Sequence, residues 1–214
     1  MKSRFSLILI ICAVIFGGIL FATKKDSKST SGGNDSAQAT NITRGGGKSG
    51  VVITEYADFQ CPACGAYYPV VEQVYEKYQD QVTFQFRHFP LRQIHQHAMV
   101  SHRAAEAANK QGKFWEMFSL LYRNQQTWSV QTDPTSTFRG FAESLGLDMA
   151  KYDADFKSEA VNDTLNADIA EGQKLGVTGT PTFFIDGKKI ENPRDADAFN
   201  KVIEDAIKAK TQPQ

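Results

Sequence analysis

The chain has 214 residues, and its 24 lysines and arginines balance 24 aspartates and glutamates, so the formal net charge is zero. With 15 Phe, 7 Tyr and 2 Trp it can bury a core, which excludes a wholly disordered or collagen-like chain. The zero charge gives no support to nucleic-acid binding, which requires a basic surplus. Three cysteines are too few for a small domain held together by disulfides.

The charges are divided unevenly along the chain. Residues 1–50 have seven basic and two acidic side chains, a net charge of +5, so residues 51–214 carry −5. The two parts differ in composition as well as in charge, and we interpret them separately.

An apolar segment occupies the start of the chain. Residues 5–22 contain no charged side chain, and a helix of this length measures about 27 Å, close to the hydrocarbon thickness of a bilayer. We predict that residues 1–22 are an N-terminal membrane anchor, in which Cys12 is a passive apolar residue. Lys2 and Arg4 before an apolar run also describe a cleavable signal peptide, and this alternative stays open.

A polar, glycine- and serine-rich segment follows at residues 23–50. It has no aromatic residue and no hydrophobic periodicity, which predicts a flexible tether. A flexible chain of this length has a root-mean-square span of about 30 Å. The tether would therefore let a folded domain reach well away from a membrane surface.

From residue 51 onward the pattern is that of a folded α/β domain, which we place at residues 51–210. Segments 51–56 and 81–89 are rich in β-branched and aromatic residues and predict strands. Apolar residues at helical spacing over about 92–175 predict an inserted block of helices. Two further strands around an Asp-Gly turn and a closing helix are expected at 181–185, 188–190 and 195–210.

Two cysteines one helical turn apart follow the first predicted strand: Cys61-Pro62-Ala63-Cys64. Pro62 favours the first turn of a helix, where a missing N–H has no cost. The unpaired amides and the helix dipole at that end stabilise an anion, so we expect a lowered pKa for the Cys61 thiol. Cys64 should be the more buried of the two, with Cys61 exposed to attack.

Two other uses of the pair compete with redox chemistry. A zinc site needs about four ligands, and there is no second CxxC motif. The remaining ligands would have to be histidines, of which the chain has four: His88, His95, His97 and His102. His95 and His97 are two positions apart and do not share a helix face. A purely structural disulfide would close too short a loop to stabilise much, so the redox interpretation is favoured.

Three motifs in order resemble the thioredoxin fold of the DsbA-like thiol–disulfide oxidoreductases, in their membrane-anchored Gram-positive (BdbD-like) type. They are the Cys61-Pro62-Ala63-Cys64 motif, Pro69 in the following helix, and the sequence at 179–185, where Thr180 and Pro181 match the cis-proline loop. The helical residues between the cysteines and Pro181 are similar to the helical insertion of that family. Glu55, six residues before Cys61, matches its buried acidic residue.

The resemblance implies a thioredoxin fold with a helical domain inserted between the second strand and the cis-proline loop. It implies that Cys61 and Cys64 form the catalytic redox disulfide without a further cofactor or metal. The other implied site residues are Glu55, which would move protons at Cys64, and the Thr180-Pro181 backbone, which would bind the client chain.

The same resemblance implies an extracytoplasmic enzyme that introduces disulfides into reduced or unfolded exported proteins. A quinone-linked membrane thiol oxidase would reoxidise it. The Pro-Ala dipeptide between the cysteines lacks the histidine of the strongest oxidases in the family, and Thr180 occurs in oxidases and isomerases alike. A reductase or isomerase of the same fold, a non-redox metal-binding module and an interaction module therefore remain alternatives.

Overall fold

A five-stranded mixed sheet organises the computed structural model, which describes residues 38–211. The strand order is β1-β3-β2-β4-β5. The strands are β1 (Ile42–Arg44), β2 (Val52–Ala57), β3 (Thr83–His88), β4 (Thr182–Ile185) and β5 (Lys188–Lys189). β2 and β3 run parallel, whereas the other neighbouring strands pair antiparallel.

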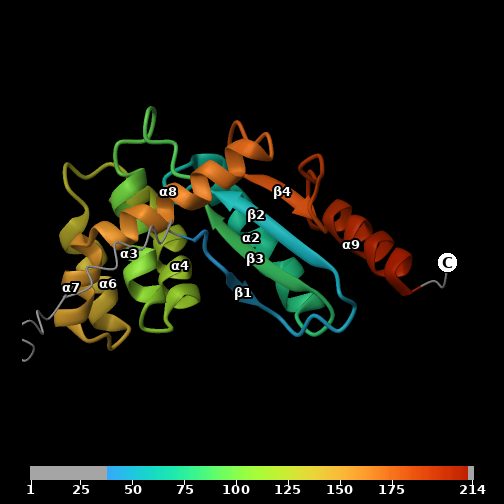
Figure 1. Cartoon of the computed structure of the whole chain (residues 1–214), viewed down its shortest axis with the longest axis horizontal. Helices are drawn as coiled ribbons and strands as arrows, with labels where there is room; N and C mark the ends of the chain where they lie inside the picture. The colour runs from blue at the N-terminus through green and yellow to red at the C-terminus, as the bar shows by residue number, and fades with distance from the viewer. Residues whose placement is uncertain (1–37, 212–214) are drawn as a thin grey trace, which may run out of the picture. The chain divides into compact units, whose positions relative to one another are not determined.

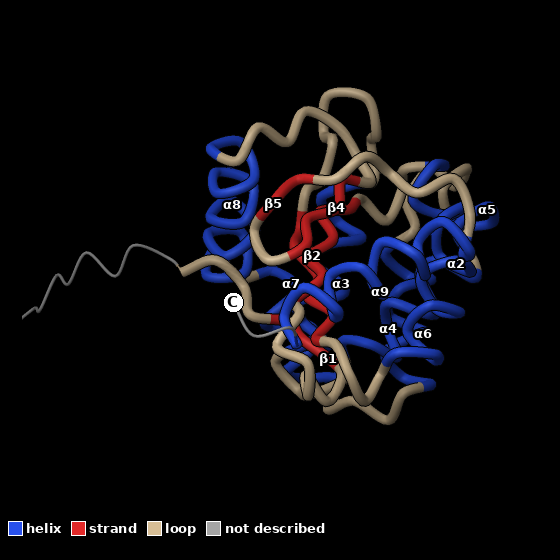
Figure 2. The backbone as a smooth tube through the Cα atoms, turned by 90° about the vertical axis from the view of Figure 1, so that its right-hand side faces the viewer, coloured by secondary structure: helices blue, strands red, loops and turns tan. Residues whose placement is uncertain are grey.

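Helices cover both faces of this sheet. Figure 2 shows α8 (Glu159–Lys174) on one side of the strands and α2 (Pro62–Tyr78) and α9 (Ala196–Thr211) on the other. Four helices between β3 and β4 gather at one end of the sheet in Figure 1: α3 (Ala98–Asn109), α4 (Phe114–Arg123), α6 (Thr135–Ser144) and α7 (Met149–Lys157). The short helix α5 (Gln125–Trp128) connects α4 to the segment before α6. The predicted α/β fold with a helical insertion is confirmed.

Alternation along the central strands divides the core into two layers. Ile53 and Phe183 pack with residues of α2 and α9, whereas Tyr56 and Phe184 pack toward α8 with Val177. Successive strand residues point to opposite faces, so Glu55 lies on the same face as Ile53. The sheet thereby places this acidic side chain beneath α2, the helix that begins at the cysteine motif.

The folded part begins earlier than the sequence predicts. β1 lies within residues 23–50, which we expected to be a tether, and it pairs with β3 so that Ile42 is 5% exposed. A three-residue strand with one aliphatic side chain leaves no periodicity in the sequence. Backbone hydrogen bonds to β3, which the sequence pattern does not show, hold this strand in the sheet. The predicted anchor at residues 5–22 and Cys12 lie outside the described residues. Within residues 38–211, no helix combines the length and hydrophobicity needed to cross a membrane.

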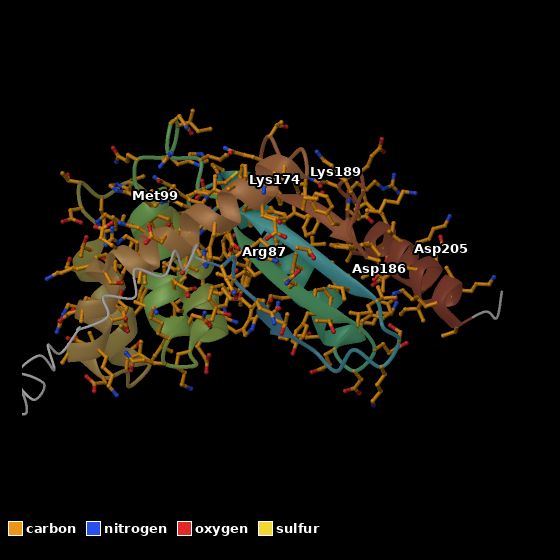
Figure 3. All side chains as sticks on the ribbon, in the orientation of Figure 1. Arg87, Met99, Lys174, Asp186, Lys189 and Asp205 are labelled. Atoms are coloured by element: carbon orange, nitrogen blue, oxygen red, sulfur yellow. The ribbon has the colours of Figure 1, made fainter. Side chains whose placement is uncertain are left out.

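A fully buried carboxylate joins the N-terminal segment, the sheet and α8. Asp168 of α8 accepts hydrogen bonds from the Thr40 amide at 2.7 Å and the Thr40 hydroxyl at 2.6 Å. It also accepts from the guanidinium of Arg87 and the amide of His88, both at 2.9 Å. Figure 3 marks Arg87 on the sheet and Lys174 at the end of α8. Four donors would lose their acceptor without this side chain.

We therefore predict that Asp168→Ala lowers the free energy of unfolding by about 3–5 kcal/mol, because it leaves the Thr40 and His88 donors without an acceptor and leaves Arg87 with Glu171 as its remaining carboxylate partner. Urea unfolding followed by circular dichroism measures the change. Asp163→Ala is the matched control, since Asp163 is an exposed aspartate of the same helix and its loss should cost less than about 0.5 kcal/mol. Equal losses in both variants would contradict this assignment.

Candidate active site

The two cysteines lie where β2 gives way to α2. Cys61 is the N-cap residue with an extended backbone, and Pro62 occupies the first helical turn. Both thiols are free, so the structure shows the reduced pair. Cys61 is 7% exposed and Cys64 1%, which places Cys64 deeper, as expected. Cys61 is nevertheless less exposed than predicted, because the Thr180 carbonyl lies 3.4 Å from its sulfur.

The two thiols have opposite acidities. A hydrogen bond from the Cys64 thiol is the main cause that lowers the pKa of Cys61 to about 5, opposed by burial and aided by the Thr180 side chain and the amides of Cys64 and Ala63. Burial is the main cause that raises the pKa of Cys64 well above its ordinary value, followed by its hydrogen bond to Cys61. Near neutral pH the reduced pair therefore consists of a Cys61 thiolate and a Cys64 thiol.

The loop at Thr180 and Pro181 faces Cys61, and the peptide bond between these two residues is cis. Asn192 donates to the Pro181 carbonyl at 2.8 Å, and the Thr182 hydroxyl donates to the Gly179 carbonyl at 2.8 Å. The Thr180 hydroxyl is buried and has no partner within residues 38–211 while Cys61 is a thiol. It becomes a hydrogen-bond donor to Cys61 once that group ionises.

Glu55 lies beneath this pair. Burial is the main cause that raises the pKa of Glu55 to about 8. The positive charge of Arg44 opposes this rise, and the negative charge of Glu72 adds to it. Its negative charge in turn contributes to the raised pKa of Cys64, so the two groups interact electrostatically. At neutral pH Glu55 holds a proton that it can donate.

Sequence reasoning missed Arg44, which we placed in the tether. Arg44 lies at the end of β1, forms an ion pair with Glu72 of α2, and stacks 3.8 Å from the ring centre of Tyr75 and 4.2 Å from that of Trp115. Its charge favours the ionised form of Glu55. No local pattern announces this role, since it follows from the pairing of β1 with β3.

The loop that leads to Cys61 is held by a second buried carboxylate. Asp58 accepts from the Leu91 amide at 2.9 Å, the His95 ring at 2.7 Å and the Gln60 amide at 2.8 Å. Although burial favours its neutral form, interactions with His102, then with His95 and the Leu91 amide, keep the pKa of Asp58 below its ordinary value. Asp58 thus connects the cysteine loop to the segment between β3 and α3.

A glutamine of the insertion completes this support. Gln125 of α5 donates from one nitrogen to the carbonyls of Phe59 at 2.7 Å and Cys61 at 2.9 Å. It packs against Gly65, where a Cβ atom would collide with its side-chain oxygen. The sequence gives Gly65 no evident purpose, but the structure shows that its missing side chain admits Gln125 to the backbone of the cysteine motif.

The four histidines considered as zinc ligands serve other contacts. His95 bonds to Asp58, His97 lies 2.8 Å from the Gln131 carbonyl, and the Nδ1 atoms of His88 and His102 are 2.6 Å apart. Over residues 38–211, no group of three or more His, Cys, Asp or Glu side chains is arranged to hold a metal ion.

Comparison with known protein families shows which family has this sheet, cysteine pair and cis-proline loop. The model of the family described as thioredoxin matches residues 37–205, most of the chain and all of the elements that build the site. The chain belongs to the thioredoxin family. Its mixed sheet with inserted helices is the fold of the DsbA-like thiol–disulfide oxidoreductases, in which the redox group is a cysteine pair and not a bound cofactor.

Solved structures agree on this fold. BdbD from Bacillus subtilis is 21% identical with a TM-score of 0.66, over 82% of this chain and 100% of that one. α-DsbA1 from Wolbachia pipientis is 21% identical with a TM-score of 0.69, over 80% of this chain and 92% of that one. Both comparisons concern the fold alone.

Curated relatives with closer sequences carry a different name. The Na⁺/H⁺ antiporter NhaA 3 of Salinispora tropica is 33% identical over 172 residues, which are 80% of this chain and 26% of that protein. NhaA of Herminiimonas arsenicoxydans is 30% identical over 161 residues, 75% of this chain and 25% of that protein. The chain therefore spans about a quarter of the length of the curated relatives it matches.

We predict that alkylation of Cys61 by iodoacetamide reaches half its maximal rate near pH 5, because the thiolate is the reactive form. Thr180→Val should move this midpoint upward, since it removes a donor to the thiolate. A midpoint near 9.0, the ordinary thiol value, would contradict the geometry.

The same shift links stability to pH. The pKa of Cys61 is lower in the folded than in the unfolded chain, so ionisation stabilises the reduced fold. This contribution is complete above about pH 9, declines as the pH falls, and is lost below about pH 5. Unfolding of the reduced chain across this range should show that slope, and Cys61→Ser should remove it.

Proposed function

We propose that this chain is a protein disulfide oxidase, which transfers the Cys61–Cys64 disulfide to client proteins. The observation that carries the proposal is the opposed acidity of the two thiols, with a pKa of about 5 for Cys61 and a strongly raised pKa for Cys64. A stable Cys61 thiolate favours the reduced form of the pair and makes the disulfide a stronger oxidant. The antiporter names do not carry it, since that match covers about a quarter of those proteins.

In the first step a client thiolate attacks the sulfur of Cys61 in the oxidised chain. The Cys61–Cys64 bond breaks, a bond forms between the client sulfur and Cys61, and Cys64 leaves as a thiolate. Because burial makes that thiolate unfavourable, it needs a proton, and Glu55 with its pKa of about 8 holds one at neutral pH. Glu55 thereby acts as the acid for Cys64.

In the second step another thiolate of the client attacks the client sulfur of the mixed disulfide. The client gains its disulfide and Cys61 leaves as a thiolate, which is a good leaving group because its pKa is low. Two electrons have passed from the client to the chain, which is left in the reduced form. A separate oxidant must restore the disulfide before the next cycle.

The Thr180 segment is the proposed client-binding edge. Its carbonyl lies 3.4 Å from the Cys61 sulfur, so the backbone of this segment is next to the site of the mixed disulfide. Main-chain hydrogen bonds to an extended client would recognise backbone more than sequence. This suits an enzyme whose clients are reduced or unfolded proteins.

The proposal includes an extracytoplasmic location, because thiol oxidation requires an oxidising compartment. Residues 5–22 would anchor the chain in the membrane, as in the membrane-anchored Gram-positive type, or would be removed as a signal. A membrane thiol oxidase that passes electrons to quinone would reoxidise the pair. The apolar segment at residues 5–22 supports the proposed export of the domain and its proposed anchoring at the membrane.

We expect Cys61→Ser to abolish oxidation of a reduced, unfolded client, because no sulfur remains to form the mixed disulfide. Cys64→Ser, with its Cys61 activated by a small disulfide, should accumulate mixed disulfides with a client that has a single cysteine, because Cys64 is no longer there to attack Cys61 and release that client. Client thiols counted by mass spectrometry after acid quenching give both results. Full activity of Cys61→Ser would contradict the mechanism.

The equilibrium reduction potential of the pair against glutathione distinguishes the direction of transfer. Strongly oxidising pairs have potentials of about −120 mV, whereas reductases lie near about −270 mV. We expect the reduction potential of the pair to be closer to that of the strongly oxidising pairs, because the Cys61 thiolate is stabilised. A reduction potential close to that of the reductases would support the reductase alternative.

A reporter fused after Gln214 tests the location. An alkaline phosphatase reporter, which is active only after export, should be active in the bacterial host. Deletion of residues 5–22 should abolish this activity. An inactive phosphatase fusion, together with activity of a cytoplasm-specific reporter fused at the same position, would refute the proposed placement.

A further inference from the structure

A polar groove of about 520 Å³ lies beside the cysteine motif, between the start of α2 and the junction of α4 and α5. Its lining includes Gln60, Pro62, Arg123, Gln125, Gln126 and Thr127. Gln60 and Pro62 are the two neighbours of Cys61 in the chain. The groove therefore lies next to the reactive cysteine, whose two chain neighbours line it.

Its charge is positive and uncompensated. Arg123 is the single charged residue of the lining, and no carboxylate within residues 38–211 lies at ion-pair distance from it. Its Nε atom donates to the Tyr68 hydroxyl at 3.2 Å, which positions the guanidinium group at the base of α4. The terminal nitrogens of the group have no hydrogen-bond partner within residues 38–211, and Gln126 and Thr127 of the same lining are exposed.

The wall nearest to Cys61 is fixed before any client arrives. Gln60 accepts from the His97 amide at 2.6 Å and donates to the Ser129 carbonyl at 3.4 Å. Gln125 donates to the carbonyls of Phe59 and Cys61. A preformed surface loses less conformational entropy when a ligand binds, so it can discriminate between client sequences.

Cys61 separates two surfaces. Its sulfur faces Thr180, the proposed backbone-binding edge, and the groove opens past Gln60 and Pro62. In a client segment joined to Cys61, residues on one side of the client cysteine would pair with Thr180, and residues on the other side would extend past Gln60 and Pro62 to the groove. We propose that the groove is a specificity subsite that binds an acidic side chain close in sequence to the client's reactive cysteine, with Arg123 as its partner. This inference rests on the proposed function.

The chemistry favours a carboxylate over other groups. A guanidinium group offers parallel N–H donors that match the two oxygens of a carboxylate, and the exposed side-chain amide of Gln126 in the same lining is a further donor. An exposed pair of this kind contributes about 0.2–1 kcal/mol, which corresponds to a preference of roughly 1.5- to 5-fold. A lysine in the same position of the client would meet a like charge and bind less well.

The test uses the full oxidised chain and three synthetic two-cysteine peptides that differ only in residues near the first cysteine, which are Glu, Gln or Lys. Stopped-flow mixing and acid quenching give the second-order rate constant for each peptide. Since a nearby acid also changes the acidity of the peptide thiol, the informative quantity is the Glu-to-Gln rate ratio, compared between variants. Dithiothreitol, which is uncharged, reports the intrinsic reactivity of the disulfide.

We expect this ratio to fall about 1.5- to 5-fold in Arg123→Gln and to be largely retained in Arg123→Lys, which keeps the charge. Lys201→Gln is the matched control, because it removes one exposed positive charge from α9, which does not line the groove, and should leave the ratio unchanged. Reactivity toward dithiothreitol should be the same in all four proteins, which shows that the variants fold.

An equal ratio in the wild-type chain and Arg123→Gln would overturn the subsite while leaving the oxidase proposal intact. A fall of the same size in Lys201→Gln would also overturn it, because the preference would then come from overall charge. Failure of dithiothreitol and of every peptide to reduce the wild-type disulfide would instead overturn the proposed function, and the subsite with it.

Discussion

Burial beneath the first turn of α2 is the constraint on which this site depends. Water is excluded from Cys64 and Glu55, so both groups favour their neutral forms. Cys61, at the open end of the same turn, instead receives hydrogen bonds from the Cys64 thiol, the Thr180 side chain and backbone amides. A single helix start thus creates an acidic and a non-acidic thiol within one turn, which is the asymmetry that directional disulfide transfer requires.

The helical insertion supports this asymmetry from outside the sheet. The loop before Cys61 is tied to the segment around Leu91 and His95 through Asp58, and to α5 through Gln125. A loop free to move could not keep the Cys61 sulfur within 3.4 Å of the Thr180 carbonyl. The insertion is therefore part of the framework of the site as well as a neighbouring surface.

Local motifs were predictable from the sequence, whereas the partners that tune them were not. Cys61 and Cys64 share one helical turn and Pro181 opens a strand, so their signals lie within a few residues. Arg44 and Gln125 act only through distant pairings, since Gln125 is 66 residues from Phe59. β1 was missed for a related reason, because three residues paired through their backbone leave almost no hydrophobic pattern. Glu55 was indicated by family resemblance. Its raised pKa depends on its burial, which results from tertiary packing and cannot be predicted from residue spacing.

The position of α8 has a consequence for how the molecule unfolds. This helix contacts both β3 of the sheet and α3 of the insertion, and its Asp168 also holds the N-terminal segment at Thr40. Loss of α8 would remove support from both parts at once, so they should melt in a single cooperative transition. Heat or denaturant would then leave no stable half-folded form with an exposed, uncontrolled thiolate.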